Sequence, residues 1–89
     1  VAHMSRKHAQ LSILNGQLIV KDLESANGTF VNGKQVQEAK LQKGDELLVI
    51  ATDPGVMQDI PAWCRVHGHQ VVSAEKYELE FHIRVLVGE

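Results

Sequence analysis

The chain has 89 residues, enough for one small hydrophobic core and too few for two independent domains. Nine Lys and Arg against eleven Asp and Glu give a formal net charge of −2, which gives no indication of nucleic acid or anionic lipid as a partner. The single cysteine, Cys64, excludes an internal disulfide. No apolar run approaches the ~20 residues that span a bilayer, and no secretory signal is evident. We therefore expect a soluble cytoplasmic protein.

The first half of the sequence predicts short antiparallel strands. Apolar residues alternate with polar ones over 9–13, Asn15-Gly16 is typical of a two-residue hairpin turn, and residues 18–23 form the returning strand. Further Asn-Gly pairs follow at 27–28 and 32–33, and Lys43-Gly44-Asp45 precedes an apolar strand at 46–51. This spacing of turns favours a β-sandwich or meander over crossover units.

The second half predicts one helix, at about 54–67. Asp53 can cap its start with Pro54 in the first helical position, and Gly68 can end it in a left-handed conformation. Pro61 should kink the helix or divide it. The apolar positions repeat with helical spacing and define one face, formed by Val56, Ile60, Trp63, Cys64 and His67.

Two strands are expected after the helix. Residues 69–73 form the first, residues 74–76 a turn, and residues 77–87 a final strand with apolar residues at every second position. The predicted fold class is α+β, in which the Ile60/Trp63/Cys64 face of one helix packs on a mostly antiparallel sheet.

Three motifs in residues 1–49 resemble the second half of a forkhead-associated (FHA) domain, the β-sandwich that recognises phosphothreonine. They are "SRKHA" at 5–9, "DLESANGTFVNG" at 22–33 and "LQKGDELLV" at 41–49. The resemblance implies that Ser5 and Arg6 bind the phosphate, whose charge and acceptor oxygens suit a hydroxyl and a guanidinium. It also implies that Asn27 holds the peptide backbone, that Gly28 permits the turn and that His8 ties the loops together.

The sequence departs from the FHA pattern in two ways. The first strands of such a domain, with the glycine-arginine loop that carries the main phosphate-binding arginine, have no counterpart in these residues. The Thr or Ser common before the asparagine is Ala26. Ser5, Arg6 and Asn27 are therefore either a weakened phosphopeptide site or loop-forming residues inherited from one.

Residues 44–87 are similar to the C-terminal half of the TusA/SirA-like sulfur-carrier proteins. The similarity rests on "GDELLVIATDPGVMQDIPAWCRVHGHQVV" and the closing strand "FHIRVLV". The Cys-Pro-x-Pro motif, in which a helix N-terminus lowers the thiol pKa in that family, is missing. Cys64 lies in the middle of the predicted helix on its apolar face, so we expect a structural thiol and no sulfur transfer.

Both resemblances share the strand at 46–51, which predicts a single hybrid domain over residues 1–89, FHA-like at 1–49 and TusA-like at 50–89. Because the chain starts at Val1, we expect a recombined or engineered chimera that serves as a scaffold without enzymatic activity. A phosphothreonine-peptide binding module is the first alternative, and a sulfur carrier the second. Unpaired strand edges could also pair between chains and form a homo-oligomer.

The remaining polar clusters predict no catalytic site and no cofactor. Cys64, His67 and His69 form a C-x-x-H-x-H pattern without a fourth ligand, and the pattern crosses a helix end, so we interpret it as coincidence rather than a zinc site. His67 more simply complements the helix dipole. No catalytic triad, paired carboxylates or nucleotide-binding loop is evident.

Overall fold

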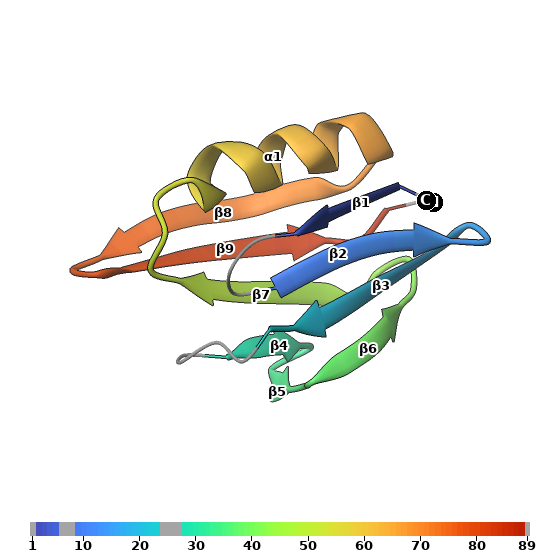
Figure 1. Ribbon diagram of the computed structural model, residues 1–89, viewed down its shortest axis with the longest axis horizontal. Coiled ribbons are helices and arrows are strands. Elements are labelled where there is room, and N and C mark those ends of the chain that lie inside the picture. The colour runs from blue at the N-terminus through green and yellow to red at the C-terminus, as the bar shows by residue number, and fades with distance from the viewer. Residues whose placement is uncertain (1, 6–8, 24–27, 89) are drawn as a thin grey trace.

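The computed structural model describes residues 2–5, 9–23 and 28–88, which form two antiparallel sheets and one helix (Figure 1). The four-stranded sheet has the order β1 (Ala2–Ser5), β2 (Ala9–Leu14), β3 (Gln17–Asp22) and β6 (Glu38–Leu41). The five-stranded sheet has the order β5 (Lys34–Gln35), β4 (Thr29–Val31), β7 (Glu46–Ala51), β9 (Glu80–Leu86) and β8 (Gln70–Tyr77). The predicted α+β class is confirmed.

The turns predicted from Asn-Gly pairs are confirmed where they are described. Asn15 and Gly16 have φ of 53° and 78° and join β2 to β3, which pair from Leu14↔Gln17 onwards. Asn32 and Gly33, with φ of 51° and 83°, join β4 to β5 in the same way. Positive φ at both central residues matches the twist of the flanking strands, and Asn and Gly tolerate it best.

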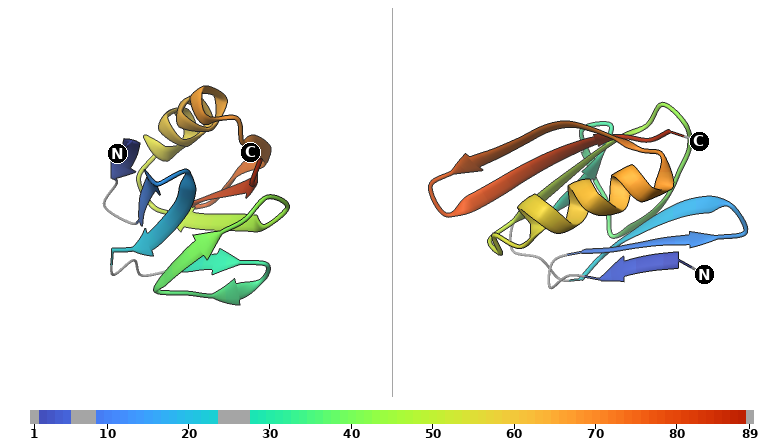
Figure 2. Two further views of the ribbon diagram at one scale, coloured as in Figure 1. Left: turned by 90° about the vertical axis from the view of Figure 1, so that its right-hand side faces the viewer. Right: turned by 90° about the horizontal axis from the view of Figure 1, so that it is seen from above.

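The core lies between the two sheets and continues under the helix. The four-stranded sheet and α1 (Val56–His67) cover the same face of the five-stranded sheet, the first beside β4 and β7 and the second over β8 and β9 (Figure 2). Alternate residues of β7 and β9 point into this core, as the strand period requires. The fully buried cluster comprises Leu11, Leu18, Val20, Leu41, Leu47, Val49, Ala51, Val56, Ile60, Cys64, Ile83, Val85 and Val87.

The helix differs from the prediction at its start. It begins at Val56 rather than residue 54, because Asp53 closes a turn before it, where the Asp53 carboxylate accepts a hydrogen bond from the Gly55 N–H at 2.8 Å. The helix is not divided at Pro61. Pro61 is the sixth of the twelve helical residues, where its missing N–H removes one intrahelical bond. The end is as predicted, at Gly68 with φ of 80°.

The predicted helix face is buried at Val56, Ile60 and Cys64, while Trp63 and His67 are half-buried at its edge. Residues 74–76, expected to form a turn, belong instead to β8. The turn is at Glu78-Leu79, and Glu78 has φ of 52°. Leu79 is 81% exposed there, so the period-two pattern that predicts one strand from 77 to 87 extends across a hairpin turn.

The two halves of the sequence share one core through β7. This strand pairs with β4 on one side and with β9 on the other, both antiparallel. Among the described residues, no helix is long and apolar enough to cross a membrane.

Candidate functional site

Two loops leave the four-stranded sheet at the same end. β1 ends at Ser5, which pairs with Gln10 of β2, and the first residue of β2, Ala9, pairs with Asp22 at the end of β3. The segment between β1 and β2 and the segment between β3 and β4 therefore start next to each other. These are the segments that carry the predicted phosphopeptide residues.

The predicted ligand residues themselves lie mostly outside the described residues. Arg6, His8 and Asn27 are not described, and Ser5 is described only as the last backbone position of β1. Their roles thus stay predictions. The described residues on both sides of the β3–β4 segment show how its ends are held.

Thr29 and Asp22 close the base of the β3–β4 segment. Thr29 is 1% exposed, and its hydroxyl donates a hydrogen bond to Oδ1 of Asp22 at 3.0 Å. The backbone adds two bonds, from Asp22 N–H to the Gln37 carbonyl at 2.7 Å and from Val36 N–H to the Thr29 carbonyl at 2.9 Å. This pair was not predicted from the sequence, although both residues belong to the motif "DLESANGT" and a buried hydroxyl requires a partner.

Gly28 has a left-handed backbone conformation beside Thr29. Its φ is +98°, and a Cβ built on it would lie 2.7 Å from Nε2 of Gln35. Any other residue here would be strained by the backbone conformation and crowded by the β5 side chain. Glycine therefore lets the chain enter β4 without backbone strain at this position.

A second set of hydrogen bonds fixes the β4–β5 turn to β7. The Asn32 side chain accepts from the Glu46 N–H at 2.9 Å and donates to Oδ1 of Asp45 at 3.2 Å. Glu46 in turn accepts from Nη1 of Arg84 on β9 at 2.9 Å. The turns of the first half are thereby tied to the second half at the sheet surface.

Cys64 has the surroundings of a structural thiol. Its side chain is 1% exposed, and burial raises its pKa from an ordinary value of 9.0 to about 11. Since the thiolate is the reactive form, this environment disfavours nucleophilic chemistry. Among the described residues, no three His, Cys, Asp or Glu side chains are grouped so that they could hold a metal ion.

Comparison with known proteins identifies two families. The model of the FHA domain matches residues 2–50, and that of Sulfurtransferase TusA matches residues 36–87. The chain belongs to both families. We call residues 2–50 the FHA segment and residues 36–87 the TusA segment. They overlap over β6 and most of β7, and β7 is the strand that both resemblances share.

Curated relatives match through part of their length. The Glycogen accumulation regulator GarA of Mycobacterium tuberculosis is 39% identical over 62 residues, which cover 63% of this chain and 38% of that protein. The Oxoglutarate dehydrogenase inhibitor of Corynebacterium efficiens is 41% identical over 46 residues, covering 52% of this chain and 32% of that protein. The matched region thus spans about a third of these relatives.

Proposed function

We propose that the FHA segment binds phosphothreonine peptides through Ser5, Arg6 and Asn27, and that the chain has no enzymatic activity. The observation that carries this proposal is the pairing of Ala9 with Asp22. This pairing places the β1–β2 segment and the β3–β4 segment at the same end of one sheet. A hydroxyl and a guanidinium on the consecutive residues Ser5 and Arg6 suit a phosphate with charge near −2.

The described residues support this proposal at the base of the loops. The hydrogen bond from the buried Thr29 to the half-buried Asp22 and the left-handed Gly28 anchor the ends of the β3–β4 segment. A loop that is fixed at its base loses less conformational entropy when it binds a peptide. The match to GarA covers 63% of this chain, and the name of that relative describes a regulator rather than an enzyme.

The test is a titration of the labelled protein with a phosphothreonine peptide and with its unphosphorylated counterpart. We expect binding of the phosphorylated peptide alone, and loss of that binding in Arg6→Ala and Asn27→Ala. Arg65→Ala is the matched control, because it removes the same charge from the exposed last turn of α1. Equal affinity for the two peptides would refute phosphate recognition.

A second proposal concerns the origin of the chain, as a recombined or engineered chimera that acts as a scaffold and folds as one hybrid domain. It is supported by the overlap of the two family matches on β7 and by a core that includes residues from both segments, such as Leu18 and Ile83. If neither peptide binds while the protein unfolds in a single cooperative transition, this scaffold function is favoured over peptide recognition.

Sulfur transfer is the proposal with least support. The TusA segment lacks the Cys-Pro-x-Pro motif, and the burial of Cys64 raises its thiol pKa. We propose that this thiol is a core residue kept reduced in a cytoplasmic setting. A persulfide formed on Cys64 of the folded protein at the rate of an exposed thiol would contradict this assignment.

A further inference from the structure

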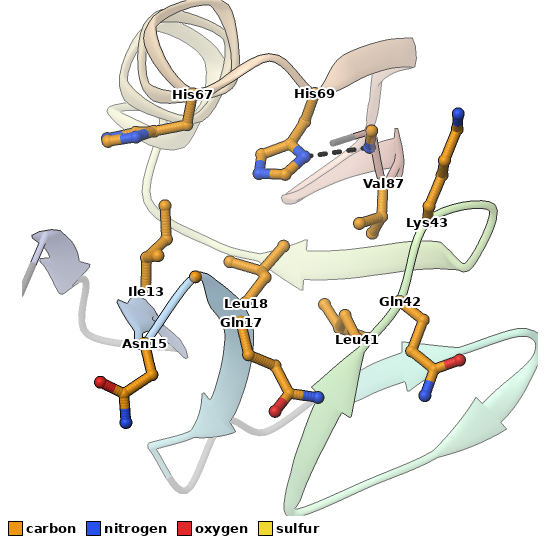
Figure 3. Close-up of a pocket in the computed structure, with 12 residues that line it drawn as sticks. Ile13, Asn15, Gln17, Leu18, Leu41, Gln42, Lys43, His67, His69 and Val87 are labelled. Atoms are coloured by element: carbon orange, nitrogen blue, oxygen red, sulfur yellow. Dashed lines mark hydrogen bonds between the residues drawn. The ribbon is translucent and has the colours of Figure 1, made fainter.

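A cavity of about 530 Å³ opens where the two family segments meet (Figure 3). Ile13, Gly16 and Leu18 of the β2–β3 hairpin line it from the FHA segment, and His67, His69 and Val87 line it from the TusA segment. Because residues of both segments line the cavity, it exists only where the two segments pack together. It lies at the Asn15-Gly16 end of the hairpin, about 17 Å along the strands from the Ala9 end with the proposed peptide loops.

The described residues that line the cavity are a mixture of apolar and polar ones, and none of them is acidic. Figure 3 shows Ile13, Leu18, Leu41 and Val87 directed toward the space beneath the two imidazoles of His67 and His69. Lys43 is the charged side chain at the rim, and none of the lining residues that the structure describes is Asp or Glu. The size and lining are those of a site for a small organic molecule, and the charges favour an anionic group over a cationic one.

His69 directs an unused hydrogen-bond donor into this region. The Gly88 N–H donates to Nδ1 of His69 at 3.0 Å, so in the neutral ring the proton is on Nε2. Nε2 is buried and has no hydrogen-bond partner among the described residues. Burial, followed by the nearby His67, lowers the pKa of His69, which favours this neutral form. A buried donor without an acceptor is uncommon in folded proteins and indicates a missing partner.

The position of the His69 ring is fixed by its neighbours. Trp63 stacks against it with centroids 5.7 Å apart and an interplanar angle of 20°, and Gly88 binds its other nitrogen. The ring centroids of Trp63 and His67 are 4.5 Å apart. Since the ring is held on both sides, Nε2 is preorganised for one acceptor.

We propose that this cavity binds a small monocarboxylate with an apolar body. The carboxylate accepts the hydrogen bond from Nε2 of His69 beside His67, and the apolar body lies on Leu18, Leu41 and Val87. A charged acceptor gains more from this donor than a neutral one, because hydrogen bonds to charged groups are the stronger ones and the surroundings are partly dry.

The test compares three ligands of one length, hexanoate, hexanol and hexylamine, by two-dimensional NMR titration of the intact chain. We expect hexanoate to shift the amides of Leu18, Leu41 and Gly88 and the Nε2 resonance of His69. Hexanol should bind about tenfold more weakly, since it keeps the apolar contact and loses the charged acceptor. Hexylamine should leave these resonances unchanged.

A pair of histidine variants locates the donor. His69→Phe keeps a ring against Trp63 and removes Nε2, so hexanoate affinity should fall about tenfold, to the level of hexanol, while hexanol affinity is unchanged. His82→Phe is the matched control, because His82 lies on β9 and does not line the cavity. If His69→Phe fails to fold, the comparison of ligands on the unmodified chain still decides.

Two results would overturn the proposal. The first is equal affinity for hexanoate and hexanol, which would mean that the cavity binds the alkyl chain without a hydrogen bond from Nε2 of His69. The second is hexanoate binding that leaves the Leu18, Leu41 and Gly88 amides unshifted, in which case the cavity holds only water. Phosphopeptide binding can fail without affecting either result, because its loops lie at the other end of the hairpin.

Discussion

Replacing Thr29 by valine removes a buried hydroxyl while nearly preserving the shape of the side chain. The hydroxyl is 1% exposed and donates to the Asp22 carboxylate at 3.0 Å. Hydrogen bonds to charged groups contribute roughly 1.5 to 3 kcal/mol to stability. Asp22 is half-buried and can regain water, so we expect the lower end, about 1.5 kcal/mol. For a domain of this size that loss corresponds to a fall in Tm of roughly 6 to 12 °C.

The assay is urea unfolding followed through the fluorescence of Trp63, the single tryptophan. A double-mutant cycle of Thr29→Val with Asp22→Ala isolates the bond from the other contacts of Asp22. Thr29→Ser is the control, because it keeps the donor and removes only a methyl group. A coupling free energy below about 0.5 kcal/mol would refute the assigned role of this pair. Phosphopeptide affinity should follow the same order, lower in Thr29→Val than in Thr29→Ser.

Three further predictions concern the second half of the chain. Gly88→Ala places a Cβ against the Gly68 carbonyl oxygen, so the backbone must shift. We expect thermal unfolding to show a loss of at least about 2 kcal/mol in stability. Wild-type stability of this variant would contradict the prediction. The Cys64 thiol, with its pKa raised to about 11, should react with iodoacetamide at pH 8 roughly a hundredfold more slowly than in urea; equal rates would contradict its burial. β8 is an edge strand with Val72 53% exposed, so a dimer should form at high concentration and be weakened by Val72→Lys; gel filtration with light scattering that shows a monomer throughout would exclude it.

The sequence predicts local structure well where one residue type determines the backbone. Asn15-Gly16 and Gly68 adopt the positive φ that their side chains, or the lack of one, permit at low cost. The turn at Glu78-Leu79 has no such residue, and the neighbouring alternation of apolar residues continued through it. Pairing with β9 extends β8 to Tyr77, which overrides the local pattern.

The two candidate sites were predictable to different degrees, because they depend on different ranges of contact. The FHA motifs predict Ser5, Arg6 and Asn27 as ligand residues, and the strand register shows that the β1–β2 and β3–β4 segments start side by side. The junction cavity joins residues as distant as Leu18 and Val87. Nothing in the local pattern around His69 indicates that its second nitrogen would be buried with no hydrogen-bond partner among the described residues.

The shared strand explains why two half-domains can form one core. Leu47, Val49 and Ala51 all face inward, and a slip of one residue would turn all three toward solvent. β4 fixes the register of β7 through Thr29↔Val49, and β9 fixes it independently through Val49↔Ile83. Since both partners require the same residues of β7 to face inward, the FHA segment and the TusA segment impose one register rather than two. The strand can therefore end one fold and begin the other without a linker.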